Sequence, residues 1–242
     1  MASWIVHLRI ADLLLSRIPN VDAAQFAIGN IAPDSGVPDE KWENFTPPPH
    51  ITHFTVGDQP ANFLHTDATF YMKYVRGLDA AAEPGVYALH LGYYFHLLTD
   101  NLWRKEIGLP TMQCWADEFA ADKDFIWEVK RDWYGLDFIH LRDHPDCIFW
   151  RVFIHAGQPQ HRLDFLPPGA VERNVAYIQK YYQTIDDEVR HRYGRPYLYL
   201  SKAEMDAFVE RTAGRCLAAW KCLLSLDDFP ADLQSSLTLV TP

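Results

Sequence analysis

The sequence lacks the short motifs of several large enzyme classes. It contains no G-x-S-x-G, no P-loop and no G-x-G-x-x-G, so nothing local supports a serine hydrolase or a nucleotide-binding fold. No run of Lys or Arg occurs, and the formal net charge is −10. A field of that sign repels phosphate backbones, so we expect no stable binding to duplex nucleic acid.

Cysteine and long apolar runs are also scarce. The four cysteines show no C-x-x-C spacing, which predicts reduced thiols and a cytoplasmic protein. The N-terminal apolar stretch is interrupted by His7, Arg9 and Asp12. This pattern predicts neither a secretory signal nor a transmembrane segment.

What is present predicts an all-α protein. We find no repeat, low-complexity tract or linker across residues 1–242, so we expect one domain, a multi-helix bundle. Hydrophobic periodicity and capping residues predict helices over about 4–17, 21–28, 61–82, 85–103, 113–134, 170–193 and 201–224. Residues 37–60, rich in proline, should form an ordered wall of a site, with Trp42, Phe45 and Phe54 as apolar anchors. Residues 106–111 should turn the chain, and 137–157 suit either a strand or a buried helix.

The segment 85–103 is the most informative part of the chain. It is apolar on nearly every face, which is typical of a helix buried in the middle of a protein, yet it carries His96 and Asp100 one turn apart. A buried carboxylate needs a partner or a metal ion. The spacing therefore indicates either a hydrogen-bonded His–Asp pair without a metal or a metal site.

Three residues elsewhere complete a set of ligand types. Taken alone, His7 is typical of a core histidine, Asp34 of a turn and His53 of a loop. Together with His96 and Asp100 they provide three imidazoles and two carboxylates. Such a mixed nitrogen and oxygen set suits zinc, or manganese or iron, at one or two positions.

These residues lie in four segments that resemble the zinc-dependent phospholipase C family, whose superfamily includes single-strand-specific nucleases. The segments are W-x-x-H (4–7), G-N-I-A-P-D (29–34), T-H-F (52–54) and L-G-Y-Y-F-H-L-L-T-D (91–100). The resemblance covers roughly the first 105 residues. It implies that His7, Asp34, His53, His96 and Asp100 bind metal, with Asp100 bridging two ions.

The chain departs from the family pattern in two places. Three residues precede Trp4, where the secreted phospholipases begin, and position 106 is Glu106 where the family has a histidine. Glu106 is one candidate to complete the site. His140 and His144 are the other candidates, provided that their segment is helical. A solvated charged turn is the commoner role for the latter pair.

The resemblance implies a metal-dependent hydrolase that acts on a small-molecule or lipid phosphoester, with Asp34 positioning or deprotonating the attacking water. Two alternatives belong to other classes. One is a non-catalytic helical protein in which the metal only joins helices. The other, ranked last, is an HD-type nucleotide phosphohydrolase, which needs a His-Asp dipeptide that this sequence lacks.

Overall fold

A computed structural model describes residues 1–41, 43–57 and 63–240 and shows an all-α bundle built around one buried helix. That helix, α5 (Pro84–Trp103), begins with a proline at its first position, where the missing N–H costs nothing. It is buried from Ala88 to Asp100. Both the all-α fold and the central helix are therefore confirmed.

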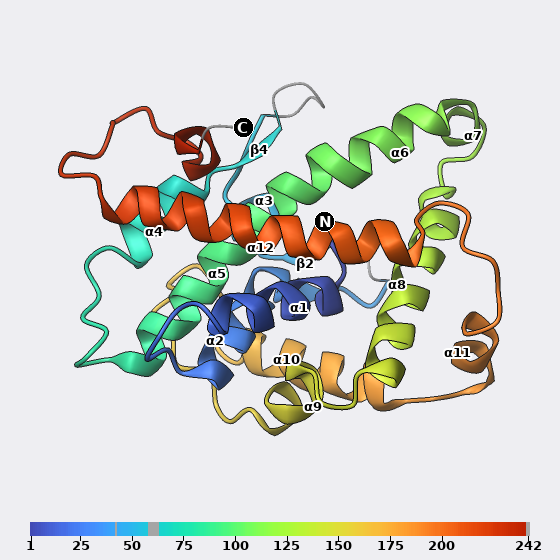
Figure 1. Ribbon diagram of the computed structural model, residues 1–242, viewed down its shortest axis with the longest axis horizontal. Helices are drawn as coiled ribbons and strands as arrows, with labels where there is room; N and C mark the ends of the chain where they lie inside the picture. The colour runs from blue at the N-terminus through green and yellow to red at the C-terminus, as the bar shows by residue number, and fades with distance from the viewer. Residues whose placement is uncertain (42, 58–62, 241–242) are drawn as a thin grey trace.

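Four helices enclose much of α5. They are α1 (Trp4–Leu15), α2 (Ala23–Gly29), α4 (Asp67–Tyr74) and α12 (Lys202–Leu224). Figure 1 shows α12 crossing in front of α5, with α1 and α2 below it. The predicted capping box opens α12: Ser201 Oγ accepts from the Glu204 amide, and the Glu204 carboxylate accepts from the Ser201 amide.

Two glycines allow α2 to approach α5 closely. A Cβ on Gly29 would lie 2.0 Å from the Leu89 carbonyl oxygen, and a Cβ on Gly92 would lie 2.3 Å from that of Phe26. Any larger residue would force the helices apart. This approach brings the C-terminal end of α2, at Asn30, against the middle of α5.

The turn predicted at residues 106–111 is wrong. The chain continues from α5 through a π-helical segment, η2 (Arg104–Gly108), into α6 (Leu109–Cys114), and the three form one rod in Figure 1. Gly108 keeps helical torsion angles, and Pro110 lies in the first turn of α6, where proline is tolerated.

Two predicted helices are each divided in two, because aspartates interrupt them. The 113–134 helix is divided into α7 (Ala116–Ala121) and α8 (Ile126–Asp143), since Asp122 is extended and its carboxylate accepts from the Asp124 amide. The 170–193 helix is divided into α10 (Ala170–Gln183) and α11 (Asp187–Arg192), since Asp186 caps the second piece.

Two other ranges also differ from the prediction. Of the predicted helix 61–82, residues 61 and 62 lie outside the described residues, and the helix in 63–82 is only α4. There β4 (Leu64–His65) pairs with β3 (Thr55–Val56), and Asp79 turns the chain beyond α4. In 137–157 there is no strand: α8 is followed by α9 (Ile148–Arg151) and the 3₁₀ turn η3 (Phe153–His155).

The proline-rich segment is ordered where the structure describes it. It contains β1 (Val37–Pro38), paired with β2 (Phe45–Thr46), and the single turn α3 (Pro49–Thr52). Before it comes the 3₁₀ turn η1 (Ala32–Asp34), and near the C-terminus lies η4 (Ser236–Leu239). The predicted anchor Trp42 lies outside the described residues.

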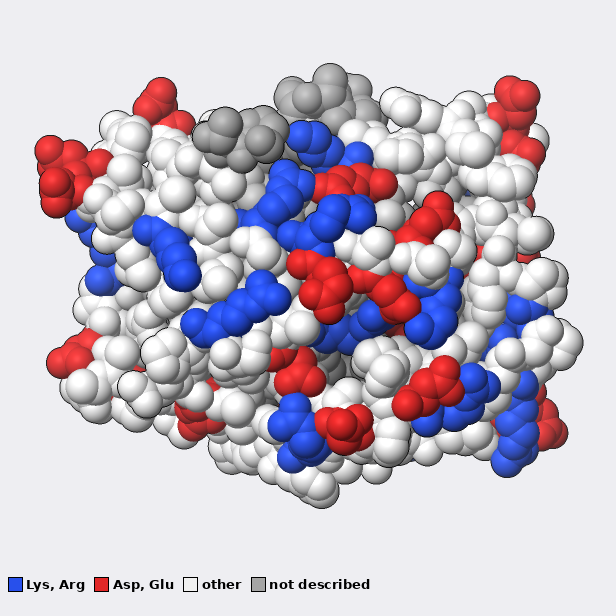
Figure 2. All heavy atoms as spheres, viewed as in Figure 1, with Lys and Arg blue, Asp and Glu red and all other residues white. Residues whose placement is uncertain are grey.

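The surface carries charges of both signs. Figure 2 shows acidic and basic side chains interleaved over α12, where Asp206 pairs with Arg9 and Lys202 and Glu106 pairs with Arg211 and Arg215. Across the described residues, no helix has both the length and the apolar character that crossing a membrane requires.

Candidate metal centre

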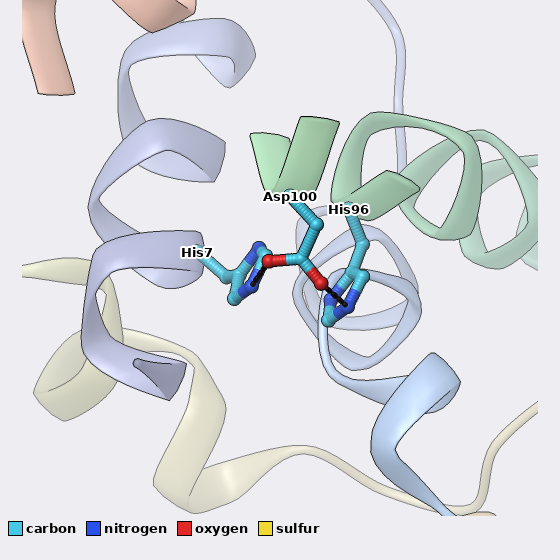
Figure 3. A group of neighbouring side chains, drawn as sticks. All are labelled: His7, His96 and Asp100. Atoms are coloured by element: carbon cyan, nitrogen blue, oxygen red, sulfur yellow. Dashed lines mark ion pairs between the residues drawn. The ribbon is translucent and has the colours of Figure 1, made fainter. Parts of the chain in front are cut away.

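The five residues predicted to bind metal lie together, although four separate segments supply them. His7 comes from α1, Asp34 ends η1, His53 follows α3, and His96 and Asp100 share one face of α5. Figure 3 shows His7 and His96 on either side of the Asp100 carboxylate. All but Asp34 are buried, and Asp34 is half-buried.

Asp100 lies at the centre of this cluster. Its Oδ2 is 3.2 Å from His96 Nε2, and its Oδ1 is 3.4 Å from His7 Nε2. The carboxylate is 1% exposed. Its two oxygens therefore face different imidazoles, as a carboxylate shared between two ligand sets would.

His53 joins the second carboxylate to the first. His53 Nε2 lies 3.3 Å from Asp34 Oδ1, 3.6 Å from Asp100 Oδ2 and 3.3 Å from His96 Nε2. Ligand atoms of Asp34, His53 and His96 all lie within 4.8 Å of one another, and the same holds for His7, His96 and Asp100. The two sets share His96.

Hydrogen bonds to backbone carbonyls determine which nitrogens of His53 and His96 carry the lone pair. His96 Nδ1 is 2.8 Å from the Asn30 carbonyl oxygen, and His53 Nδ1 is 3.1 Å from that of Pro49. A carbonyl can only accept, so each Nδ1 donates its proton. In the neutral rings, both Nε2 atoms therefore direct lone pairs at each other and at carboxylate oxygens.

The cluster thus gathers acceptors with few donors between them. Neither ring nitrogen of buried His7 has a hydrogen-bond partner, and Asp100 Oδ2 has none. Unpaired acceptors in a dry interior are costly unless a proton or a cation lies among them. The donor set of imidazole nitrogens and carboxylate oxygens fits a divalent cation such as zinc.

The pKa values show which groups compete with a cation. Burial, and then His96, lower the pKa of His7 to about 4, so its ring is neutral at pH 7. Burial opposes ionisation of Asp34, but His53 and His96 lower its pKa to about 2. Burial also acts to lower the pKa of His96, yet the carboxylates of Asp100 and Asp34 raise it. A proton on His96 is therefore the competitor of a metal ion.

Contacts that the sequence did not reveal orient the ligands. The Trp4 indole N–H donates to Asp34 Oδ2 at 2.9 Å, and the Ala2 amide donates to Asp100 Oδ1 at 2.8 Å. Trp4 is the first residue of the W-x-x-H segment, which was the available signal. His65, which had no predicted role, lies beside His53 with ring centroids 5.3 Å apart and the rings tilted by 45°, and burial lowers its pKa to about 3.

The residues considered as completing the site do not join it. The Glu106 carboxylate pairs with Arg211 and Arg215 on α12. His140 and His144 stack on each other with ring centroids 4.4 Å apart, and they belong to neither potential ligand set. Their segment is helical as far as Asp143.

A cavity of about 630 Å³ opens beside the cluster. Asp34 and His53 line it, and the ordered proline-rich segment supplies Pro38, Phe45 and Pro47 to the wall. Side chains of α8 and α10 supply much of the remaining lining. The cluster is therefore accessible to a small molecule through Asp34 and His53.

Comparisons with models of known protein families, with curated proteins and with solved structures find no match for this chain. The resemblance to zinc-dependent phospholipases C therefore stays a prediction from four sequence segments. What the site does must be argued from its geometry.

Proposed function

We propose that the chain is a metal-dependent hydrolase of phosphoesters. Its ligands are His7, Asp34, His53, His96 and Asp100, and they hold one or two zinc ions, for which manganese or iron are substitutes. The substrate is a small-molecule or lipid phosphoester, and a phosphodiester is the class that the sequence resemblance favours.

One observation supports this proposal above the others. His53 Nε2 and His96 Nε2 lie 3.3 Å apart, and carboxylate oxygens lie 3.2 to 3.6 Å from them. The Nδ1 of each ring donates its proton to a backbone carbonyl, so in the neutral rings neither Nε2 carries one. Four acceptors meeting in this way call for positive charge among them. A structural His–Asp pair would need only one acceptor facing one donor.

The chemistry divides between the metal and the chain. A bound divalent cation supplies an acidified water as nucleophile and positive charge for the phosphoryl oxygens. Asp34 is the carboxylate that faces the cavity, and the Trp4 indole fixes its orientation. With a pKa of about 2 it is a weak proton acceptor, so it positions the attacking water by accepting a hydrogen bond.

Burial favours one competing function. His7, His96 and Asp100 are at most 1% exposed, and such an enclosed set also suits an ion that only joins α1 to α5. The cavity beside Asp34 and His53 argues for catalysis, because a purely structural site needs no access.

The test begins with metal content. Protein stripped with a chelator and reloaded with zinc should hold about one or two ions per chain, and it should hydrolyse bis(p-nitrophenyl) phosphate only when loaded. His96→Ala should lose the metal. His155→Ala, which removes an exposed histidine away from the cluster, is the matched control and should retain it.

The results separate the functions. Metal content well below one ion per chain, unchanged by His96→Ala, would overturn the metal site. Stoichiometric metal whose removal lowers the melting temperature, with no turnover on a panel of monoesters and diesters, would instead identify a non-catalytic metal-stabilised protein.

A further inference from the structure

Aromatic side chains make up much of the lining of the cavity beside the metal cluster. Trp127, Trp133 and Tyr134 come from α8, Tyr177 comes from α10, and Trp4 borders Asp34. Trp4 and Tyr177 meet edge to face with ring centroids 6.0 Å apart. Such surfaces favour flat, apolar groups.

The charge in this cavity is distributed unequally. Among the described residues that line it, Asp34 is the one carboxylate, and it belongs to the candidate ligands. Lys130 and Arg173 also line it, Lys130 half-buried and Arg173 exposed. Away from the cluster, the cavity therefore presents cations and no anion.

Lys130 is held at the aromatic wall. Its Nζ lies 4.6 Å from the centroid of the Trp127 ring. It makes no ion pair with any carboxylate in the part of the chain that the structure describes, although Asp34 attracts it electrostatically from a greater distance. Burial lowers the Lys130 pKa. A partly desolvated ammonium without an ion-pair partner is ready to bind an anion.

We propose that this cavity binds the organic part of the substrate and that Lys130 contacts an anionic oxygen of the bound phosphoester. The proposal rests on the proposed function and refines its substrate class. The substrate carries an aromatic or other flat apolar group. It does not carry a quaternary ammonium, because the Trp127 ring already faces the Lys130 ammonium and a second cation placed in the cavity beside it would be repelled.

Two inert probes test this proposal by isothermal titration calorimetry. Phenylphosphonate is aromatic and anionic and has no hydrolysable ester, whereas phosphocholine carries a phosphate and a quaternary ammonium. Wild-type protein should bind phenylphosphonate about tenfold more tightly than phosphocholine or better. Each probe is titrated into zinc-loaded protein and into chelator-treated protein.

Substitutions then assign the effect to the side chain. Lys130→Gln should weaken phenylphosphonate binding about tenfold or more, and Lys130→Arg should stay within about threefold of the wild type. Phosphocholine binding should not weaken in Lys130→Gln. The matched control is Lys73→Ala, which removes an exposed lysine whose Nζ lies 4.7 Å from the Tyr74 ring, outside the cavity. It should leave both affinities unchanged. Melting curves confirm that each variant is folded.

Three results would overturn the proposal: no phenylphosphonate binding, phosphocholine binding as tight as phenylphosphonate, or a folded Lys130→Gln that behaves like Lys73→Ala. These outcomes are independent of the fate of the proposed function. If the protein holds no metal and hydrolyses nothing, the titrations of chelator-treated protein still show whether Lys130 binds anions.

Discussion

Two buried aspartates, Asp132 and Asp100, differ in what surrounds them. Asp132, on α8, accepts from the amides of Leu198 and Tyr199 at 2.7 and 2.8 Å and pairs with Arg195 at 3.0 Å. Asp100, on α5, faces imidazole nitrogens on both oxygens and accepts from one backbone amide. Both carboxylates are at most 1% exposed.

The difference lies in the neighbours and not in the burial. Asp132 is surrounded by donors and an arginine, so it holds the segment before α12 in place without any added group. Asp100 is surrounded by side chains that are themselves acceptors when neutral, so its neighbourhood is complete only with a cation or a proton. A buried charge is therefore evidence of a site only when its partners lack protons.

The largest expected effect separates these two aspartates by substitution. Loss of a hydrogen-bond partner outside the ligand shell weakens metal binding about 10- to 100-fold. Asp100→Asn removes a ligand, so it should weaken zinc binding by more than this, and turnover should fall with the zinc content. Asp132→Asn should leave zinc content per folded chain unchanged and lower the free energy of unfolding by about 1–3 kcal/mol. Zinc titration and urea melts of both variants measure this.

Two results would contradict the difference proposed between Asp100 and Asp132. Equal zinc content in Asp100→Asn and wild type would place the metal elsewhere or nowhere. Loss of zinc from a folded Asp132→Asn variant would show that the contrast between the surroundings of Asp132 and Asp100 does not locate the metal site.

The second effect is a pH dependence of the metal-free protein. The carboxylates around His96 raise its pKa above the ordinary value of 6.5. The stability from its imidazolium is thus complete below pH 6.5 and is lost as pH rises through the raised pKa. Metal-free protein should therefore lose stability as pH rises above 6.5, where zinc-loaded protein should not.

Melting temperatures at several pH values, with zinc and with chelator, measure this effect, and zinc affinity should increase over the same range because the competing proton is released. His96→Gln should remove the loss from the metal-free protein. Identical pH profiles with and without zinc would mean that no metal replaces the proton.

The smallest expected effect concerns a third buried carboxylate, Asp137, whose two oxygens both accept hydrogen bonds. Asp137 accepts from the hydroxyls of Ser3 and Tyr182, each at 2.6 Å, and burial raises its pKa to about 7. Its contribution to stability is complete below the ordinary pKa of 3.8 and is lost as pH rises through about 7.

Asp137→Asn should flatten the decrease in stability between the two pKa values, 3.8 and about 7, by at most about 1.4 kcal/mol per pH unit, without altering zinc content. Urea melts across that range check the prediction, and Asp132→Asn serves as a comparison. An unchanged slope would show that Asp137 is ionised in the fold.

The sequence predicted the central helix and the His96–Asp100 pair because both follow from local patterns. A helix without a polar face must be buried, and the i, i+4 spacing alone places His96 over Asp100. The link from His7 and His53 to that pair required the resemblance. No local pattern brings α1 and α3 to α5.

What the sequence could not give are contacts set by distant parts of the chain. The Asn30 carbonyl that fixes the His96 ring depends on the close approach at Gly29 and Gly92. The helix breaks at Asp122 and Asp186 were missed because a side-chain cap competed with strong helical periodicity.

The central claim is that a cation lies among the acceptors of this cluster. Crystals of zinc-loaded protein, measured on both sides of the zinc absorption edge, test it most directly. We predict an anomalous peak about 2.0–2.2 Å from His96 Nε2 and from a carboxylate oxygen of Asp100 or Asp34. A map without a peak at the cluster, with the five side chains in the same places, would contradict it.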